Sequence, residues 1–135
     1  MSDKIDSALI QAFTDGAFGL SWASENRAFT PTAGTAWAEL FVIPNQPSVA
    51  SLGDDGYDLH DGILQINLNY PADTGAGAAK AKATAIRDYF YAGRSVLYSG
   101  QYVEVVSCGR DRAGRSVDSW YQIVVTVFWR AWTNR

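Results

Sequence analysis

The chain has 135 residues, of which 47% are apolar and 19% are charged. This length suits a single core, and the apolar content excludes an intrinsically disordered chain. We therefore expect residues 1–135 to form one domain. No apolar run approaches the roughly 18 residues of a membrane helix, and the first residues lack the apolar core of a signal peptide. The one cysteine, Cys108, excludes an internal disulfide and a cysteine-based zinc site, which favours a reducing, cytosolic setting.

The net charge of −3 is divided unevenly along the chain. Residues 1–61 hold nine acidic and two basic residues, a balance of −7, whereas residues 62–135 hold five acidic and nine basic residues, a balance of +4. Such asymmetry suits copies of one protein that meet through unlike faces, because complementary potentials steer association. Ordinary variation of surface charge is the alternative.

The first half of the chain reads as a helix followed by two strands and a long connection. Apolar residues at helical spacing predict a helix over residues 3–13, and residues 19–23 suit a short edge strand. Residues 37–43 form a further strand that Pro44 closes. Residues 45–61 have little periodicity, which predicts a long loop, and loops of that length are functional or flexible.

The most regular stretch begins at Gly62. Over residues 62–70 apolar and polar side chains alternate, which is typical of a half-buried strand, and Pro71 ends it. An alanine-rich helix follows over residues 78–92 and stops at Gly93. The polar face of this strand carries Gln65, Asn67 and Asn69, none of which is a catalytic residue type.

The end of the chain is again β-structure. Strands over residues 95–99 and 102–108 flank a two-residue turn, and residues 108–116 form a polar hairpin loop. The last strand, residues 120–132, is apolar on one face and half apolar on the other, which predicts a central strand covered on both sides. The order α-β-β-β-α-β-β-β predicts an α+β fold, with two helices packed on a mostly antiparallel β-sheet or sandwich.

One cluster resembles an active site, namely Asp54, Asp55, Asp58, His60 and Asp61. Four carboxylates and an imidazole could bind a divalent cation or act as general acids and bases. The spacing matches no calcium-loop or zinc-peptidase motif, so a solvated loop is the interpretation that we favour. The sequence predicts no catalytic, cofactor or metal site.

Three further features have a functional and a structural interpretation. Cys108 would be a nucleophile if His60 approached it, but its position at a strand end favours a structural cysteine. Gly75-Ala76-Gly77 precedes a helix yet lacks the ending of a phosphate-binding loop. Basic residues in the 108–116 loop suit phosphate or, as we prefer, salt bridges between subunits; they are Arg110, Arg112 and Arg115.

Several segments together carry a family resemblance. They are the helix over residues 3–13, Leu40-Phe41-Val42-Ile43-Pro44 with the following Pro47, the strand 62–71, the alanine-rich helix up to Gly93, and the strand 121–127. In these the chain resembles the small tail-terminator proteins of long-tailed phages, the lambda-type minor tail protein family also found in prophages. The Trp-rich end at residues 128–132 departs from the family pattern.

The resemblance implies a structural virion protein that is no enzyme and needs no cofactor. Such proteins form a six-membered ring on the tail tube, stop its polymerisation and offer a surface to the head completion proteins, while DNA passes through the hole. The partners would be copies of itself, the tail tube protein and the head completion or connector protein, with no membrane. The location would be the phage tail, after assembly in the host cytoplasm. We expect the subunit or tube contacts to include Asp54, Asp55, Asp58, Arg110, Arg112 and Arg115.

Two alternatives stay open at this point. A different ring of the neck, such as a head–tail connector, would use the same scaffold. A small hydrolase or ligand-binding α+β domain would instead use the Asp54–Asp61 loop.

Overall fold

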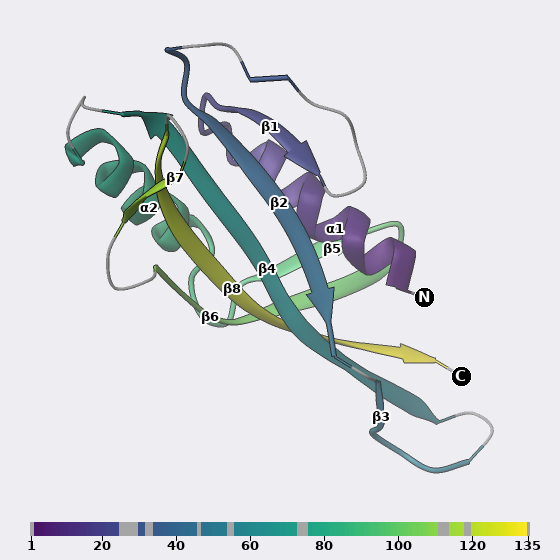
Figure 1. Cartoon of the computed structure of the whole chain (residues 1–135). Helices are drawn as coiled ribbons and strands as arrows, with labels where there is room; N and C mark the ends of the chain where they lie inside the picture. Colours follow the sequence, from purple (N-terminus) through teal and green to yellow (C-terminus); the bar gives the residue numbers. More distant parts are fainter. Residues whose placement is uncertain are drawn as a thin grey trace.

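The computed structural model describes residues 2–24, 30–31, 34–45, 47–53, 56–72, 76–110, 114–117 and 120–134. Within these residues it has two helices and eight strands (Figure 1). The elements are α1 (Ser2–Asp15), β1 (Ser21–Ser24), β2 (Trp37–Pro44), β3 (Ser48–Val49), β4 (Tyr57–Pro71), α2 (Gly77–Tyr89), β5 (Ser95–Tyr98), β6 (Gln101–Arg110), β7 (Arg115–Val117) and β8 (Trp120–Asn134). No described helix has the length and apolarity needed to cross a membrane.

All eight strands belong to one sheet. Six of them follow the order β1-β2-β4-β8-β6-β5, while β3 pairs with β4 and β7 pairs with β8. β1 and β2 run parallel, and the other pairs are antiparallel. The predicted α+β class with a mostly antiparallel sheet is therefore confirmed. β4 and β8 pair along their whole lengths, from Tyr57 opposite Asn134 to Pro71 opposite Trp120. β8 lies in the middle of the sheet, as its apolar pattern predicts.

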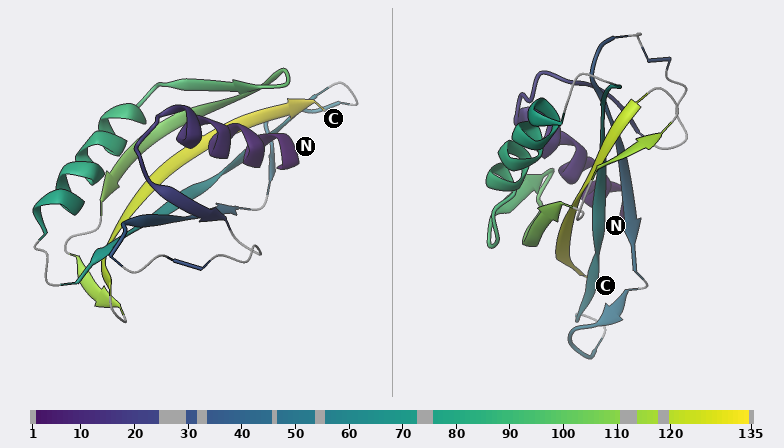
Figure 2. Two further views of the ribbon diagram at one scale, coloured as in Figure 1. Left: turned by 90° about the horizontal axis from the view of Figure 1, so that it is seen from above. Right: turned by 60° about the vertical axis from the view of Figure 1, so that its left-hand side comes forward.

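Both helices lie on one face of the sheet, and the sheet curls around α1 (Figure 2). We call this face concave and the opposite face convex. α1 contacts β2, β5 and β6, whereas α2 contacts β4, β6 and β8. Alternate residues of the strands point to the concave face and form the core with the helices. The largest fully buried side chains are Trp129, Phe90, Ile5, Leu9, Leu40, Leu64, Ile66, Leu68, Ile86 and Ile123.

Small residues allow α2 to approach the sheet closely. Ala79, Ala83 and Ile86 recur at helical spacing and are buried, while Lys80 and Arg87 point outward. Lys82 donates a hydrogen bond to the Phe18 carbonyl and so links α2 to the turn after α1. The helix begins at Gly77, close to the predicted start.

The prediction that β8 is covered on both sides is wrong for the isolated chain. Its concave-facing side chains from Ile123 to Thr133 are buried. On the convex face Phe128 remains 48% exposed and Trp132 43% exposed. The sequence pattern indicates that β8 has apolar side chains on both faces. In the described part of the chain, however, no helix covers the convex face.

The predicted 45–61 loop is partly wrong as well, because much of it is β-structure. β3 pairs with the beginning of β4, and β4 continues beyond β2 toward the end of β8. The result is an arm, defined here by the described residues 47–53 and 56–61, that projects from the body (Figure 1). Local periodicity is weak here because none of the described apolar side chains of the arm is buried, so neither face of its strands has to be apolar.

The predicted 108–116 hairpin loop is shorter than expected. β6 extends to Arg110, and β7 then pairs with β8 at Gln122, Tyr121 and Trp120. A register shift between Val105 and Ser107 marks a bulge in β6. β7 therefore continues the edge of β8 at the point where β6 leaves it.

Gly62 offers a test of the β2–β4 pairing that supports the arm. A Cβ atom at this position would collide with the Ile43 carbonyl oxygen and lie 2.8 Å from the Pro44 Cα. We expect Gly62→Ala to lower the free energy of unfolding by roughly 1–3 kcal/mol, because two backbone segments would have to separate. Urea denaturation of the purified variant measures this. The control is Gly109→Ala in β6, where a Cβ would meet nothing within 4 Å; equal losses in both variants would contradict the argument.

Candidate functional site

The acidic cluster of the sequence does not converge on one point. Asp54 and Asp55 lie outside the described residues. Asp58 and His60 point to the concave side of β4, whereas Asp61 points to the convex side, because neighbouring residues of a strand face opposite ways. His60 Nε2 lies 2.8 Å from Thr133 Oγ1, and partial burial lowers the pKa of this histidine. Among the described residues there is no group of three or more His, Cys, Asp or Glu side chains placed to hold a metal ion.

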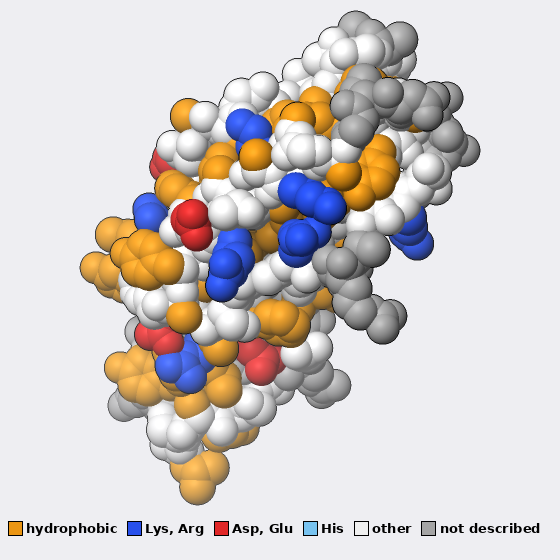
Figure 3. Space-filling view, turned by 90° about the vertical axis from the view of Figure 1, so that its left-hand side faces the viewer, with side chains coloured by type: hydrophobic (Ala, Val, Ile, Leu, Met, Phe, Trp, Pro, Cys, Tyr) orange, Lys and Arg blue, Asp and Glu red, His pale blue; other side chains and the backbone are white. Residues whose placement is uncertain are grey.

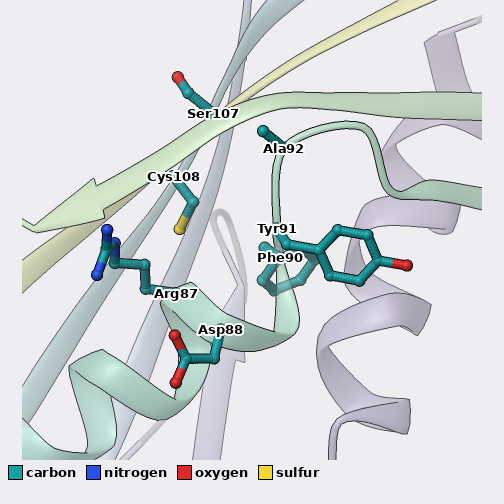
Figure 4. Close-up of a pocket in the computed structure, with 7 residues that line it drawn as sticks. All are labelled: Arg87, Asp88, Phe90, Tyr91, Ala92, Ser107 and Cys108. Carbon is teal, nitrogen blue, oxygen red and sulfur yellow. The ribbon is translucent and has the colours of Figure 1, made fainter.

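Cys108 and His60 are not neighbours. Cys108 of β6 lies opposite Val127 of β8, which lies opposite Leu64 of β4. His60 is four residues, about 13 Å, further along β4. The Cys108 side chain instead points from β6 toward α2, beside Arg87 (Figure 4). Burial raises the pKa of its thiol to about 11, against a smaller opposing effect of Arg87. This is the environment of a structural cysteine rather than of an activated nucleophile.

The Cys108 side chain lines a groove between α2 and β6, which we call the α2–β6 groove. Its volume is about 330 Å³. The lining residues are Arg87, Asp88, Phe90, Tyr91, Ala92, Ser107 and Cys108. Figure 4 shows Arg87 rising from α2 toward β6, while the Tyr91 ring extends away from Cys108. The groove therefore combines one cation and one carboxylate with apolar surface.

The three predicted interface arginines differ in environment. Arg112 lies outside the described residues. Arg110 is exposed at the end of β6, on the same side of the strand as Cys108. Arg115 is exposed on β7, and its Nη2 donates to Gln122 Oε1 at 3.3 Å. Arg115 thus has a contact within its own subunit, whereas Arg110 presents its charge at the strand end.

Arg115 begins a hydrogen-bonded chain that crosses the convex face. Gln122 donates to Asn69 Oδ1 at 3.0 Å, and Asn69 donates to Glu39 Oε1 at 3.2 Å. The two amides are buried, with 6% and 2% of their surfaces exposed. Every bond runs in the same direction, from a cation to an anion, so each amide satisfies its neighbour. Sequence reasoning missed this chain, because its members come from four strands and only the register brings them together.

The other half of the convex face is apolar. Five side chains from β2, β4, β6 and β8 form what we call the convex patch, namely Ile43, Ile63, Val106, Phe128 and Trp132. A shallow groove of about 490 Å³ runs beside Ile63, Val106 and Phe128. Between Phe128 and Trp132 lies Arg130, which forms an ion pair with Glu104 at 2.5 Å. Exposed apolar surface that spans several strands marks a site of protein contact.

Comparison with known proteins agrees with this arrangement. The sequence model of the phage tail terminator family matches residues 4–129. The chain belongs to this family. Two solved structures share the fold. One, which carries no functional name, aligns with a TM-score of 0.78 and 19% identity over 97% of this chain and 95% of its own. The other is a chain from the virion of a native gene transfer agent particle, with a TM-score of 0.56 and 21% identity over 99% and 97%.

No curated protein matches the chain. Family membership confirms the resemblance that the sequence carries, and it makes the chain a structural protein of the phage tail. Its place is the virion tail, where its partners are tail and head components. The family also suggests a role without catalysis, which accords with the separation of His60 from Cys108.

The hydrogen-bonded chain predicts that Arg115 and Arg110 respond differently to charge reversal. Arg115→Glu should lower the free energy of unfolding by roughly 1–2 kcal/mol, since the buried Gln122 carbonyl loses its donor and meets a carboxylate. Arg110→Glu makes the same change of charge at the exposed end of β6 and should leave stability within about 0.5 kcal/mol. Urea denaturation of both variants measures the difference. Identical stabilities would mean that the hydrogen bonds from Arg115 to Glu39 do not stabilise the position of β7.

The raised pKa of Cys108 predicts slow alkylation. At pH 8 an ordinary thiol is roughly 25% ionised, whereas a thiol with a pKa of about 11 is about 0.1% ionised. We expect iodoacetamide to modify Cys108 about 100-fold more slowly than an exposed cysteine, with a rate that rises up to pH 11. The reference is Ser116→Cys in a Cys108→Ser background. Equal rates at pH 8 would restore the nucleophile hypothesis.

Proposed function

We propose that the chain forms a homohexameric ring that caps the phage tail tube, stops tube polymerisation and provides the surface that joins the head. DNA passes through the centre of this ring. The proposal treats residues 1–135 as a single domain, the unit that is repeated around the ring. The acidic residues Asp54, Asp55 and Asp58 and the basic residues Arg110, Arg112 and Arg115 belong to its subunit or tube contacts.

The convex patch is the observation that carries this proposal. Isolated apolar residues are common on protein surfaces, but here Ile43, Ile63 and Phe128 lie directly opposite one another on β2, β4 and β8. Val106 lines the same groove, and Trp132 lies beyond Arg130 on the same face of β8. In an isolated subunit this apolar surface is exposed to water. Burying it against another protein would be favourable. A broad sheet face also suits contact with another rigid protein. We assign the patch to the contact with the last ring of the tail tube protein.

Electron microscopy of phage lysates that lack this gene tests the proposal. Tail tubes of abnormal and variable length, without heads, are the expected result, because nothing would stop the tube. Plasmid-borne wild-type protein should restore normal tails. Normal-length tails beside DNA-filled, unattached heads would instead indicate a neck connector that acts after length is fixed. Normal infectious particles would overturn both.

The same complementation assay tests the convex patch. Phe128→Asp should fold but fail to restore tail length, because a carboxylate would be buried against the tube. The control is Tyr98→Asp, which changes an exposed aromatic residue of β5 outside the patch. Circular dichroism of both purified variants verifies the fold. Full complementation by Phe128→Asp would remove the patch from the proposal.

A further inference from the structure

Hydrogen bonds among the described residues near the end of the arm hold an apolar side chain in solvent. The amides of Ala50 and Ser51 both donate to the Tyr57 carbonyl, at 2.9 and 3.1 Å, and the Tyr57 amide donates to Ser51 Oγ at 2.8 Å. Between these bonds lies Leu52, of which 90% is exposed. A leucine held outward by a hydrogen-bonded turn is preorganised for contact, since little conformational entropy is lost on docking.

The charge of the arm has one sign. Residues 44–61 contain four Asp and neither Lys nor Arg. Two arms would therefore repel each other, which disfavours a symmetric contact of arm with arm. A partner surface must supply positive charge together with room for an apolar side chain.

The α2–β6 groove has both properties. Arg87 lines the groove, Lys80 lies two turns earlier on the same side of α2, and Arg110 follows Cys108 on the same side of β6. Figure 3, which faces the left-hand side of Figure 1, shows Lys and Arg side chains near the middle of this face, with Asp or Glu side chains beside them. Tyr91, which is 55% exposed, adds an apolar wall.

Figures 1 and 2 show that the arm projects from the end of the β4–β8 ribbon that is far from α2. Cys108 of the groove lies level with Leu64, in the middle of that ribbon. The arm thus points away from the groove of its own subunit and toward the space that a neighbouring copy would occupy. We propose that the arm of one copy docks in the α2–β6 groove of the next copy, with Leu52 inside the groove and the acidic arm against Arg87 and Arg110. This contact joins two unlike surfaces and so repeats around a ring. It rests on the proposed ring and specifies how its subunits meet.

The convex patch is a poorer acceptor for the arm. The cation between Phe128 and Trp132, Arg130, is already paired with Glu104. Asp61 also faces this side, beside the same groove. An acidic arm would meet like charge there, beside a cation that already has a partner. The α2–β6 groove also contains a carboxylate, Asp88, but Arg87 lines it and Lys80 and Arg110 flank it, so cations outnumber anions at this site.

Photo-crosslinking locates the docked arm. A benzophenone amino acid replaces Leu52 in the full-length protein, which is irradiated as the purified oligomer. We expect crosslinks between copies, and peptide mass spectrometry should place them at residues 87–92 and 107–108. The matched control carries the same probe at Leu97, a half-exposed residue of edge strand β5, and should not label these residues. Rings whose position-52 crosslinks map elsewhere would overturn the docking and leave the ring intact.

Charge variants provide a second readout through native mass spectrometry. Arg87→Glu combined with Arg110→Glu should raise the protein concentration needed for half-assembly at least about tenfold, as should Leu52→Asp. Lys4→Glu, at an exposed cation of α1, and Leu97→Asp should change it less than about twofold. Rings insensitive both to Leu52→Asp and to the combined Arg87→Glu and Arg110→Glu change would contradict the docking alone. A wild-type protein that stays monomeric at high concentration and in phage lysates would contradict the ring and the docking together.

Discussion

The antiparallel pairing of β4 with β8 is the interaction on which the other elements depend. Each strand contributes fifteen residues, and the register continues from one end of the sheet to the other. β2 pairs with one edge of this ribbon and β6 with the other, while β3 and β7 occupy the remaining edge positions. The ribbon is longer than the strands beside it, so its far end projects as the arm. If one strand slipped by one residue against the other, its buried side chains would move to the opposite face of the sheet and leave the core.

The helices cover one face of this ribbon, which leaves the other face to carry two kinds of surface. Toward β7 the convex face is polar, and the directed chain from Arg115 to Glu39 satisfies its buried amides. A Trp37–Trp120 ring contact lies in the adjoining rows of the sheet. Toward the arm the same face is apolar. The polar half therefore fixes the register within the subunit, and the apolar half remains available to another protein.

Sequence reasoning succeeded where a signal is local and failed where it depends on a distant partner. The period of α1, the alternation of residues 62–70 and the turn at Gly100 predict elements that the structure contains. The arm escaped prediction because residues 57–61 extend only by pairing with the end of β8. The apolar convex side chains of β8 were recognised, but a pattern of residues cannot tell a cover within the chain from a cover supplied by another protein. Asp58 and Asp61 are neighbours in the sequence, yet the strand directs them to opposite faces.

The proposed ring gives the arm and the α2–β6 groove one task and the convex patch another. A protein that stops a polymer must bind its end without presenting a copy of that end for further growth. If each arm occupies the groove of the next subunit, the unlike surfaces satisfy one another within the ring, and closure leaves no arm and no groove unoccupied. The convex patch is not used in this contact and stays free for the tube. Because the arm is acidic and the patch is apolar with an internally paired Arg130, the two contacts differ in chemistry, so neither surface competes for the partner of the other.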